Sequence, residues 1–156
     1  MARRRRAEQR TTIADPRYNS ELLARIINTV MRRGAKSVAE RVVYGALDEI
    51  REKTGEDPLG VTIRAIDNIK PRVEVKSRRV GGATYQVPVE VSRDRQLALA
   101  LRWTIQYASA RKGVPMRKAL ALELMEAYKN QGNAIKKRDD THKMAQANKA
   151  FAHYAW

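Results

Sequence analysis

Apolar residues recur at helical spacing through the first part of the chain. From Leu22 to Met31, positions three and four apart are apolar, which predicts an amphipathic helix that follows an N-cap at Ser20. The segment Ser37-Val38-Ala39-Glu40 fits a capping box and predicts the start of a second helix. Asp57-Pro58 predicts the start of a third, because proline is favoured at the first helical position. Three helices are therefore expected before residue 70.

The hydrophobic period changes from helical to alternating between residues 72 and 91. Valines at 73 and 75, and then at 87, 89 and 91, alternate with polar residues on either side of Gly81-Gly82, which predicts a β-hairpin. A two-residue loop at Gly81-Gly82 would place the two sets of valines on opposite faces. A three-residue loop from Gly81 to Ala83 would pair Val75 with Val89 and gather the valines on one face. Because a one-residue slip turns every side chain to the other face, we predict the three-residue loop.

Helical spacing resumes after Ser92 and predicts three more helices. The fourth should end near Arg111, the fifth should begin at Pro115, and the sixth should run from about residue 134 to 150 with a thin apolar stripe. The predicted fold class is therefore mainly α: a bundle of about six helices with one protruding β-hairpin at about residues 72–91. The length of the chain favours a single domain spanning residues 1–156. Since an isolated hairpin is marginally stable, we expect only its base to rest on the bundle and a partner outside the chain to hold its tip.

The charge of the chain points to a polyanionic partner. Lys and Arg number 32 against 17 Asp and Glu, which gives a net charge of +15. Nucleic acid is the first candidate, and an anionic membrane surface is the second. No apolar segment approaches the roughly 18 residues of a membrane-spanning helix. Residues 1–17 are basic and nearly free of apolar side chains, so we expect a tail that is mobile when free and orders along phosphates.

The residues that could carry catalysis form no convincing set. The absence of cysteine excludes disulfides, thiolate metal sites and a cysteine nucleophile. His142 and His153 would lie about 16 Å apart along a helix, too far to share a metal ion. Ser109-Ala110-Arg111-Lys112 fits a Ser-x-x-Lys pattern by chance alone, without its companion motifs. We therefore predict no enzymatic activity, no metal site and no cofactor.

Basic residues fall into four clusters along the sequence. These are Arg3, Arg4, Arg5, Arg6 and Arg10 in the tail; Lys70, Arg72, Lys76, Arg78, Arg79, Arg93 and Arg95 on the hairpin and its base; Arg111, Lys112, Arg117 and Lys118; and Lys136, Lys137, Arg138, Lys143 and Lys149. Lys36 and Arg41 could join the first or the third cluster in space. Each cluster has the alternative of a solvated surface, and charge on the hairpin could instead protect a strand edge. Four separated clusters favour a large folded nucleic acid over a short duplex site.

Aromatic residues accompany two of these regions. In the three-residue-loop register, Tyr85 lies opposite Arg79, where an exposed ring among guanidinium groups could stack on an unpaired base. At the C-terminus, Phe151, Tyr154 and Trp156 could either cap the bundle or dock on a partner.

The hairpin segment is also specific enough to suggest a family. KPRVEVKSRRVGGATYQVPVEV, residues 70–91, resembles the β-arm of the small-subunit ribosomal protein seven family in its bacterial form. The resemblance covers essentially all 156 residues through MARRRR, LLARIINTVMRRG, EKTGEDPL, ALRW and AHYAW. Two positions depart from the pattern: Ala35, where the family often has Lys, and Ala155, where it often has Arg.

This resemblance implies a helical protein with a β-arm that acts in the ribosome in the cytoplasm. It implies binding to the 3′ major domain of small-subunit ribosomal RNA (rRNA), nucleation of head assembly, and an arm near exit-site tRNA and mRNA, with platform protein eleven among the neighbours. The residues carried over to rRNA are Arg3, Arg4, Arg5, Arg6, Arg10, Lys36, Arg41, Arg95, Arg102, Arg111 and Lys112; those of the arm are Lys76, Arg78, Arg79, Gly81, Gly82 and Tyr85. The charges alone would also suit a sequence-neutral DNA-binding protein or, less well, an enzyme acting on nucleic acid.

Overall fold

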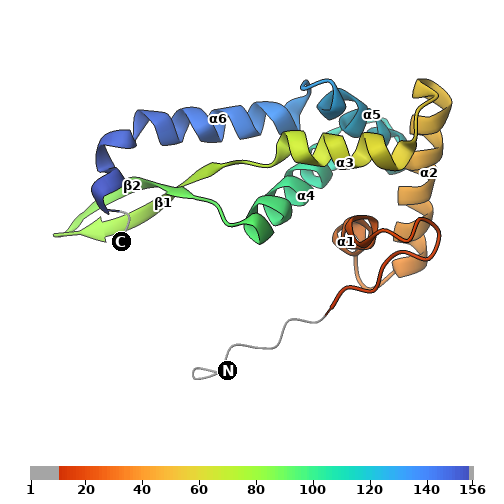
Figure 1. Cartoon of the computed structure of the whole chain (residues 1–156), viewed down its shortest axis with the longest axis horizontal. Helices are drawn as coiled ribbons and strands as arrows, with labels where there is room; N and C mark the ends of the chain where they lie inside the picture. The colour runs from red at the N-terminus through yellow and green to blue at the C-terminus, as the bar shows by residue number, and fades with distance from the viewer. Residues whose placement is uncertain (1–10, 155–156) are drawn as a thin grey trace.

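Five helices form a bundle around the main apolar core (Figure 1). The computed structural model describes residues 11–154. The bundle consists of α1 (Glu21–Val30), α2 (Lys36–Thr54), α3 (Pro58–Ile69), α4 (Arg93–Ala110) and α5 (Met116–Tyr128). The hairpin consists of β1 (Val73–Val80) and β2 (Ala83–Glu90). Beside it lie α6 (Asn133–Ala147) and a 3₁₀ turn, η1 (Lys149–Tyr154). The predicted class, mainly α with one β-hairpin, is confirmed.

The core is made of aliphatic side chains that meet between the helices. Leu47 and Ile50 of α2, Ile66 and Ile69 of α3, and Leu120 of α5 are almost completely buried. Each lies on the apolar stripe of its helix, so the spacing seen in the sequence sets which face turns inward. This body is the rigid part to which the hairpin is attached.

Local capping signals set some of the helix starts. The Ser20 hydroxyl accepts the Leu23 N–H, and the Asp57 carboxylate accepts the N–H groups of Leu59 and Gly60, as the sequence predicts. The prediction for Ser37 is wrong, because α2 begins one residue earlier and has Ala35 as its N-cap, without a side-chain hydrogen bond. The backbone at Arg33 and Gly34 is left-handed (φ 53° and 78°), so the turn that leads into α2 is complete before Ser37, which lies inside the helix.

The predicted three-residue hairpin loop is wrong. Val80 pairs with Ala83, so the loop contains only Gly81-Gly82, both of which have positive φ (57° and 90°). Two such residues suit a type I′ turn, whose twist matches that of the flanking strands. Val75 therefore pairs with Pro88, and the two valine sets lie on opposite faces. The prediction assumed that only one face would find cover, whereas neither valine set is left exposed in the structure.

The hairpin is also less isolated than predicted. Helix α6 extends beside it, and η1 lies against β2 toward the tip (Figure 1). The expectation that only the base of the hairpin would touch the rest of the chain is therefore wrong. The physical reason is that the chain continues past the sixth helix as a 3₁₀ turn that carries aromatic side chains.

Part of the predicted N-terminal tail, residues 1–17, is anchored on the body. Its arginines at 3–6 and 10 lie outside the described residues, and Ile13 is 88% exposed, but the chain is held at Asp15. Asp15 is buried, and its carboxylate accepts the N–H groups of Arg17 and Tyr18 and the hydroxyl of Tyr44, the last at 2.5 Å. A single buried aspartate therefore anchors the chain where it enters the bundle.

Candidate nucleic-acid interface

The hairpin, which we call the arm (Val73–Glu90), has two chemically different faces near its tip. Directly opposed residues of an antiparallel pair project to the same side. Arg78 pairs with Tyr85, and both are half-buried; we call this the covered face, and the buried Val87 extends it toward the base. The other side, the open face, carries four exposed residues: Ser77, Arg79, Thr84 and Gln86. The expected pairing of Tyr85 with Arg79 is therefore wrong.

An ion-pair cluster holds the base of the arm. Glu74 is 7% exposed, and its carboxylate accepts Arg95 Nε at 2.7 Å and lies 3.6 Å from Lys76 Nζ. The Arg95 hydrogen bond holds the pKa of Glu74 below its usual value, against the opposing effect of burial. Arg95 and Lys76, both predicted to contact RNA, thus share one carboxylate that joins β1 to α4. Their side chains remain about half exposed.

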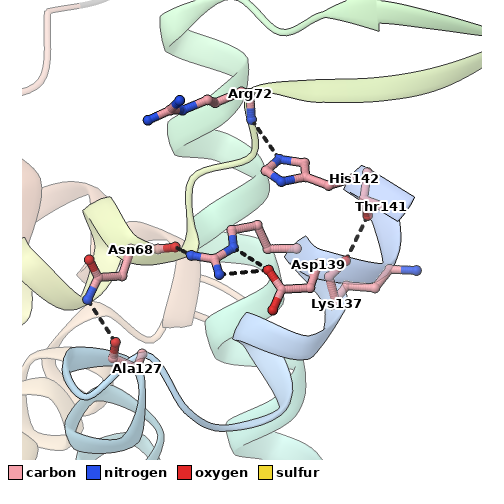
Figure 2. Close-up of polar contacts among 8 residues, drawn as sticks. Asn68, Arg72, Ala127, Lys137, Asp139, Thr141 and His142 are labelled. Carbon is pink, nitrogen blue, oxygen red and sulfur yellow. Dashed lines mark hydrogen bonds and ion pairs between the residues drawn. The ribbon is translucent and has the colours of Figure 1, made fainter. Parts of the chain in front are cut away.

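Helix α6 is fastened to the base of the arm by a second set of contacts (Figure 2). His142 Nε2 accepts the Arg72 N–H at 3.0 Å. Burial and the positive charges of Arg138 and Arg72 lower the pKa of His142, while Asp139 opposes them. Arg138 donates to the Asn68 carbonyl at the end of α3 and to Asp139. His142 therefore has a structural role between α6 and the start of β1.

The third basic cluster contains an internal ion pair. Arg111 contacts Glu123 at 2.7 Å and Glu126 at 2.6 Å, and these hydrogen bonds raise its pKa. Glu123 is completely buried and also accepts the Ala134 N–H at 3.0 Å. The Arg111 guanidinium, predicted to bind RNA, is thus used within the protein, while its neighbour Lys112 is exposed.

The remaining predicted cations lie on several elements of the body. Lys36 lines a cavity together with residues 11–16, whereas the tail arginines lie outside the described residues. Arg102 lines a groove between α1 and α4 with Arg25. Arg41 is exposed on α2. Together with the arm and Lys112, these residues place basic groups on several separate elements of the molecule.

Sequence reasoning missed the acidic residues that organise these cations. Asp15, Glu74 and Glu123 are buried, and each is bonded to a group distant in sequence. The docking of Phe151 and Tyr154 on Tyr85 was also missed, although these aromatics had been noted.

Two structural findings bear on other classes of function. Within residues 11–154, no group of three or more His, Cys, Asp or Glu side chains is placed to hold a metal ion. Every helix in the same range is too short or too polar to cross a lipid bilayer.

Comparison with known proteins gives a consistent result. The family model described as ribosomal protein S7p/S5e matches residues 2–149. The chain belongs to this ribosomal family. Small ribosomal subunit protein uS7 of Anaeromyxobacter sp. (strain Fw109-5) is 56% identical over 156 residues and all of both chains. The proteins of the same name from Akkermansia muciniphila (59% over 157 residues, 100% of both chains) and Thermotoga petrophila (58% over 154 residues, 99% of both) are similarly close.

Membership in the S7p/S5e family confirms the resemblance seen in the sequence and its bacterial type. It supports a structural, RNA-binding role in the small ribosomal subunit and in translation; the family is one of ribosomal proteins, not of enzymes. The matched segment includes the whole arm and all of α6.

Proposed function

We propose that this protein binds the 3′ major domain of small-subunit rRNA in the cytoplasmic ribosome and nucleates assembly of the subunit head. The observation that carries this proposal is the spread of basic groups over separate elements of an S7p/S5e chain with a net charge of +15. Lys and Arg displace condensed counterions from phosphates, so affinity should fall steeply with salt. A protein that contacts several RNA helices at once fixes their relative orientation, and this is how binding would promote assembly.

The proposed RNA contacts are assigned according to how exposed each basic side chain is. We assign phosphate contacts to the tail arginines at 3–6 and 10 and to the exposed Lys36, Arg41, Arg102 and Lys112. Lys76 and Arg95 keep about half of their side-chain surface available beside Glu74. Arg111 acts mainly by fixing the loop that presents Lys112, because its own guanidinium is paired. Recognition would rest on the shape of folded RNA, because the deep, narrow major groove of an RNA helix keeps side chains away from its base edges.

The arm is the second part of the proposal. It would lie near exit-site tRNA and mRNA mainly through Arg79 and the Gly81-Gly82 turn. Lys76 and Arg78, on the opposite face, would add positive charge beside Tyr85, which is part of the framework of the arm. Glycines at the tip let the backbone approach a phosphate closely, because they add no side chain there. Platform protein eleven is the proposed protein neighbour, and residues 1–156 are proposed to act as one domain.

A binding titration at two salt concentrations tests the function. The probe is the isolated 3′ major domain, with equal-length random duplex DNA and unstructured RNA as competitors. With roughly 6–10 phosphate contacts, affinity should drop by about 10³–10⁵ between about 50 and 200 mM salt for any polyanion, so selectivity decides. Binding to the rRNA domain that survives excess competitor supports the proposal. Equal binding to all three nucleic acids would overturn it in favour of a sequence-neutral polyanion binder.

A further inference from the structure

The arm and the C-terminal turn are joined by three aromatic rings. The ring of Tyr85 on β2 lies 5.3 Å from that of Phe151 and 5.2 Å from that of Tyr154, centroid to centroid, with interplanar angles of 48° and 32°. These separations fall within the range for favourable aromatic pairs, which prefer tilted or offset arrangements over a face-to-face sandwich. Tyr85 therefore contacts two side chains that are more than 60 residues away in sequence.

The turn that supplies these rings is itself fixed in place. The Phe151 N–H donates to the Asn148 carbonyl at 3.0 Å, and His153 Nδ1 lies 2.9 Å from the Ala150 carbonyl oxygen. The ring of His153 lies 3.9 Å from that of Tyr154, centroid to centroid, with an interplanar angle of 46°. A short 3₁₀ segment thus presents two aromatic side chains to the arm in a defined geometry.

The covering of the arm is one-sided near its tip. Val87 shares its face with Tyr85 and is completely buried, whereas a free two-stranded ribbon would expose both of its faces to water. On the open face, Arg79, Thr84 and Gln86 remain exposed, and Gln86 donates to Ser77 across the strands at 3.0 Å. The side chains that remain exposed on the open face are therefore ones that can donate hydrogen bonds to phosphates or base edges.

We propose that Phe151 and Tyr154 are positioning residues that brace the arm through Tyr85, so that its open face, with Arg79 at the centre, is the face that meets RNA. In this arrangement Tyr85 is an anchor within the protein and not a platform for an unpaired base. The C-terminal turn acts on RNA binding through the arm and without contacting the RNA itself. The RNA part of this inference rests on the proposed function, whereas the bracing of the arm does not.

The brace can be tested in the free, full-length protein. The variant is Phe151→Ala/Tyr154→Ala, and the matched control is Ala152→Ser, an exposed position of the same turn. Amide hydrogen exchange of β2 should speed up about tenfold or more in the double variant, while amides of α2 and α3 keep their protection. The single variant Tyr154→Phe, which keeps the aromatic ring, should keep most of the protection that the wild-type protein shows in β2. Unchanged exchange in β2 of the double variant would overturn the brace.

The orientation of the arm on RNA needs a second readout. Because the chain has no cysteine, Thr84→Cys provides a single attachment site on the open face for a probe that cleaves nearby RNA. In small subunits that contain the probe-bearing protein with the brace intact, cleavage of bound tRNA and mRNA should be confined to a few sites, and the double variant should lose several-fold in intensity there. The same cleavage in both proteins would overturn the positioning role. Faster exchange in β2 together with no selective rRNA binding by the wild-type protein would instead leave the brace standing and reject the proposed function.

Discussion

The helical body and the arm are stabilised in different ways. In the body, many aliphatic side chains from α1 to α5 share one core, and no single contact is decisive. The arm depends on a few identifiable contacts: Glu74 with Arg95, His142 with Arg72, and Tyr85 with the C-terminal turn. The body should therefore tolerate most substitutions on its surface, whereas single substitutions can loosen the arm and leave the body folded.

Removing core volume from the body should have the largest effect. Ile66 is about 1% exposed, and Ile66→Ala should lower the free energy of unfolding by about 2–5 kcal/mol, because it removes buried contacts and leaves a cavity. Urea unfolding followed by circular dichroism measures this change. Ile63→Ala on the same helix is the control, since Ile63 is 40% exposed and should cost far less. Equal losses in both variants would contradict the assignment of the inward face of α3.

Breaking the buried carboxylate cluster should have the next largest effect. Glu123→Gln removes the charge opposite Arg111 in a site without solvent, so we expect a loss of about 1–3 kcal/mol in the free energy of unfolding. Glu126→Gln is the matched control, because Glu126 binds the same guanidinium but is partly exposed. If the Glu126 variant proved the less stable of the two, Glu123 would not be the carboxylate that matters.

The contact between α6 and the arm should depend on pH. His142 accepts a hydrogen bond only when it is neutral, and its pKa is below the usual 6.5. The unfolded chain then binds a proton more readily, so the contribution of this bond is complete above about pH 7 and is lost as the pH falls through 6.5 toward the folded pKa. We expect at most about 0.5–1.5 kcal/mol, the usual worth of one hydrogen bond. NMR titration of the imidazole should give a midpoint below 6.5; a midpoint at or above 6.5 would contradict the assignment.

Much of the fold follows from local signals in the sequence. Capping residues such as Ser20 and Asp57 act within one turn, so they mark where a helix begins, and the apolar period marks the face that will be packed. The capping signal at Ser37 gave a wrong prediction, because the preceding loop decides where α2 begins. The register of the arm also escaped prediction, because it depends on how many faces are covered, and that cover comes from residues about 60 positions later.

The candidate site was predictable in kind but not in detail. Basic clusters and the arm motif are visible in the sequence, since charge needs no tertiary contact to be counted. The internal partners are single acidic residues without periodicity, so nothing in the sequence marks Glu74 or Glu123 as the groups that engage Arg95 and Arg111. Whether a cation is exposed or already paired is thus decided by the fold, and this separates Lys112 from its neighbour Arg111.

The smallest expected effect separates the two faces of the arm. Arg79→Glu should weaken binding to tRNA by a few-fold and lower the salt slope by about one unit, as expected for one lost phosphate contact. Its circular dichroism and unfolding midpoint should stay unchanged, because Arg79 is exposed on the open face. Lys129→Glu is the matched control: it makes the same change of charge at an exposed position outside the four basic clusters. If both variants lost affinity equally, only net charge would matter, and the open face of the arm would hold no phosphate contact of its own.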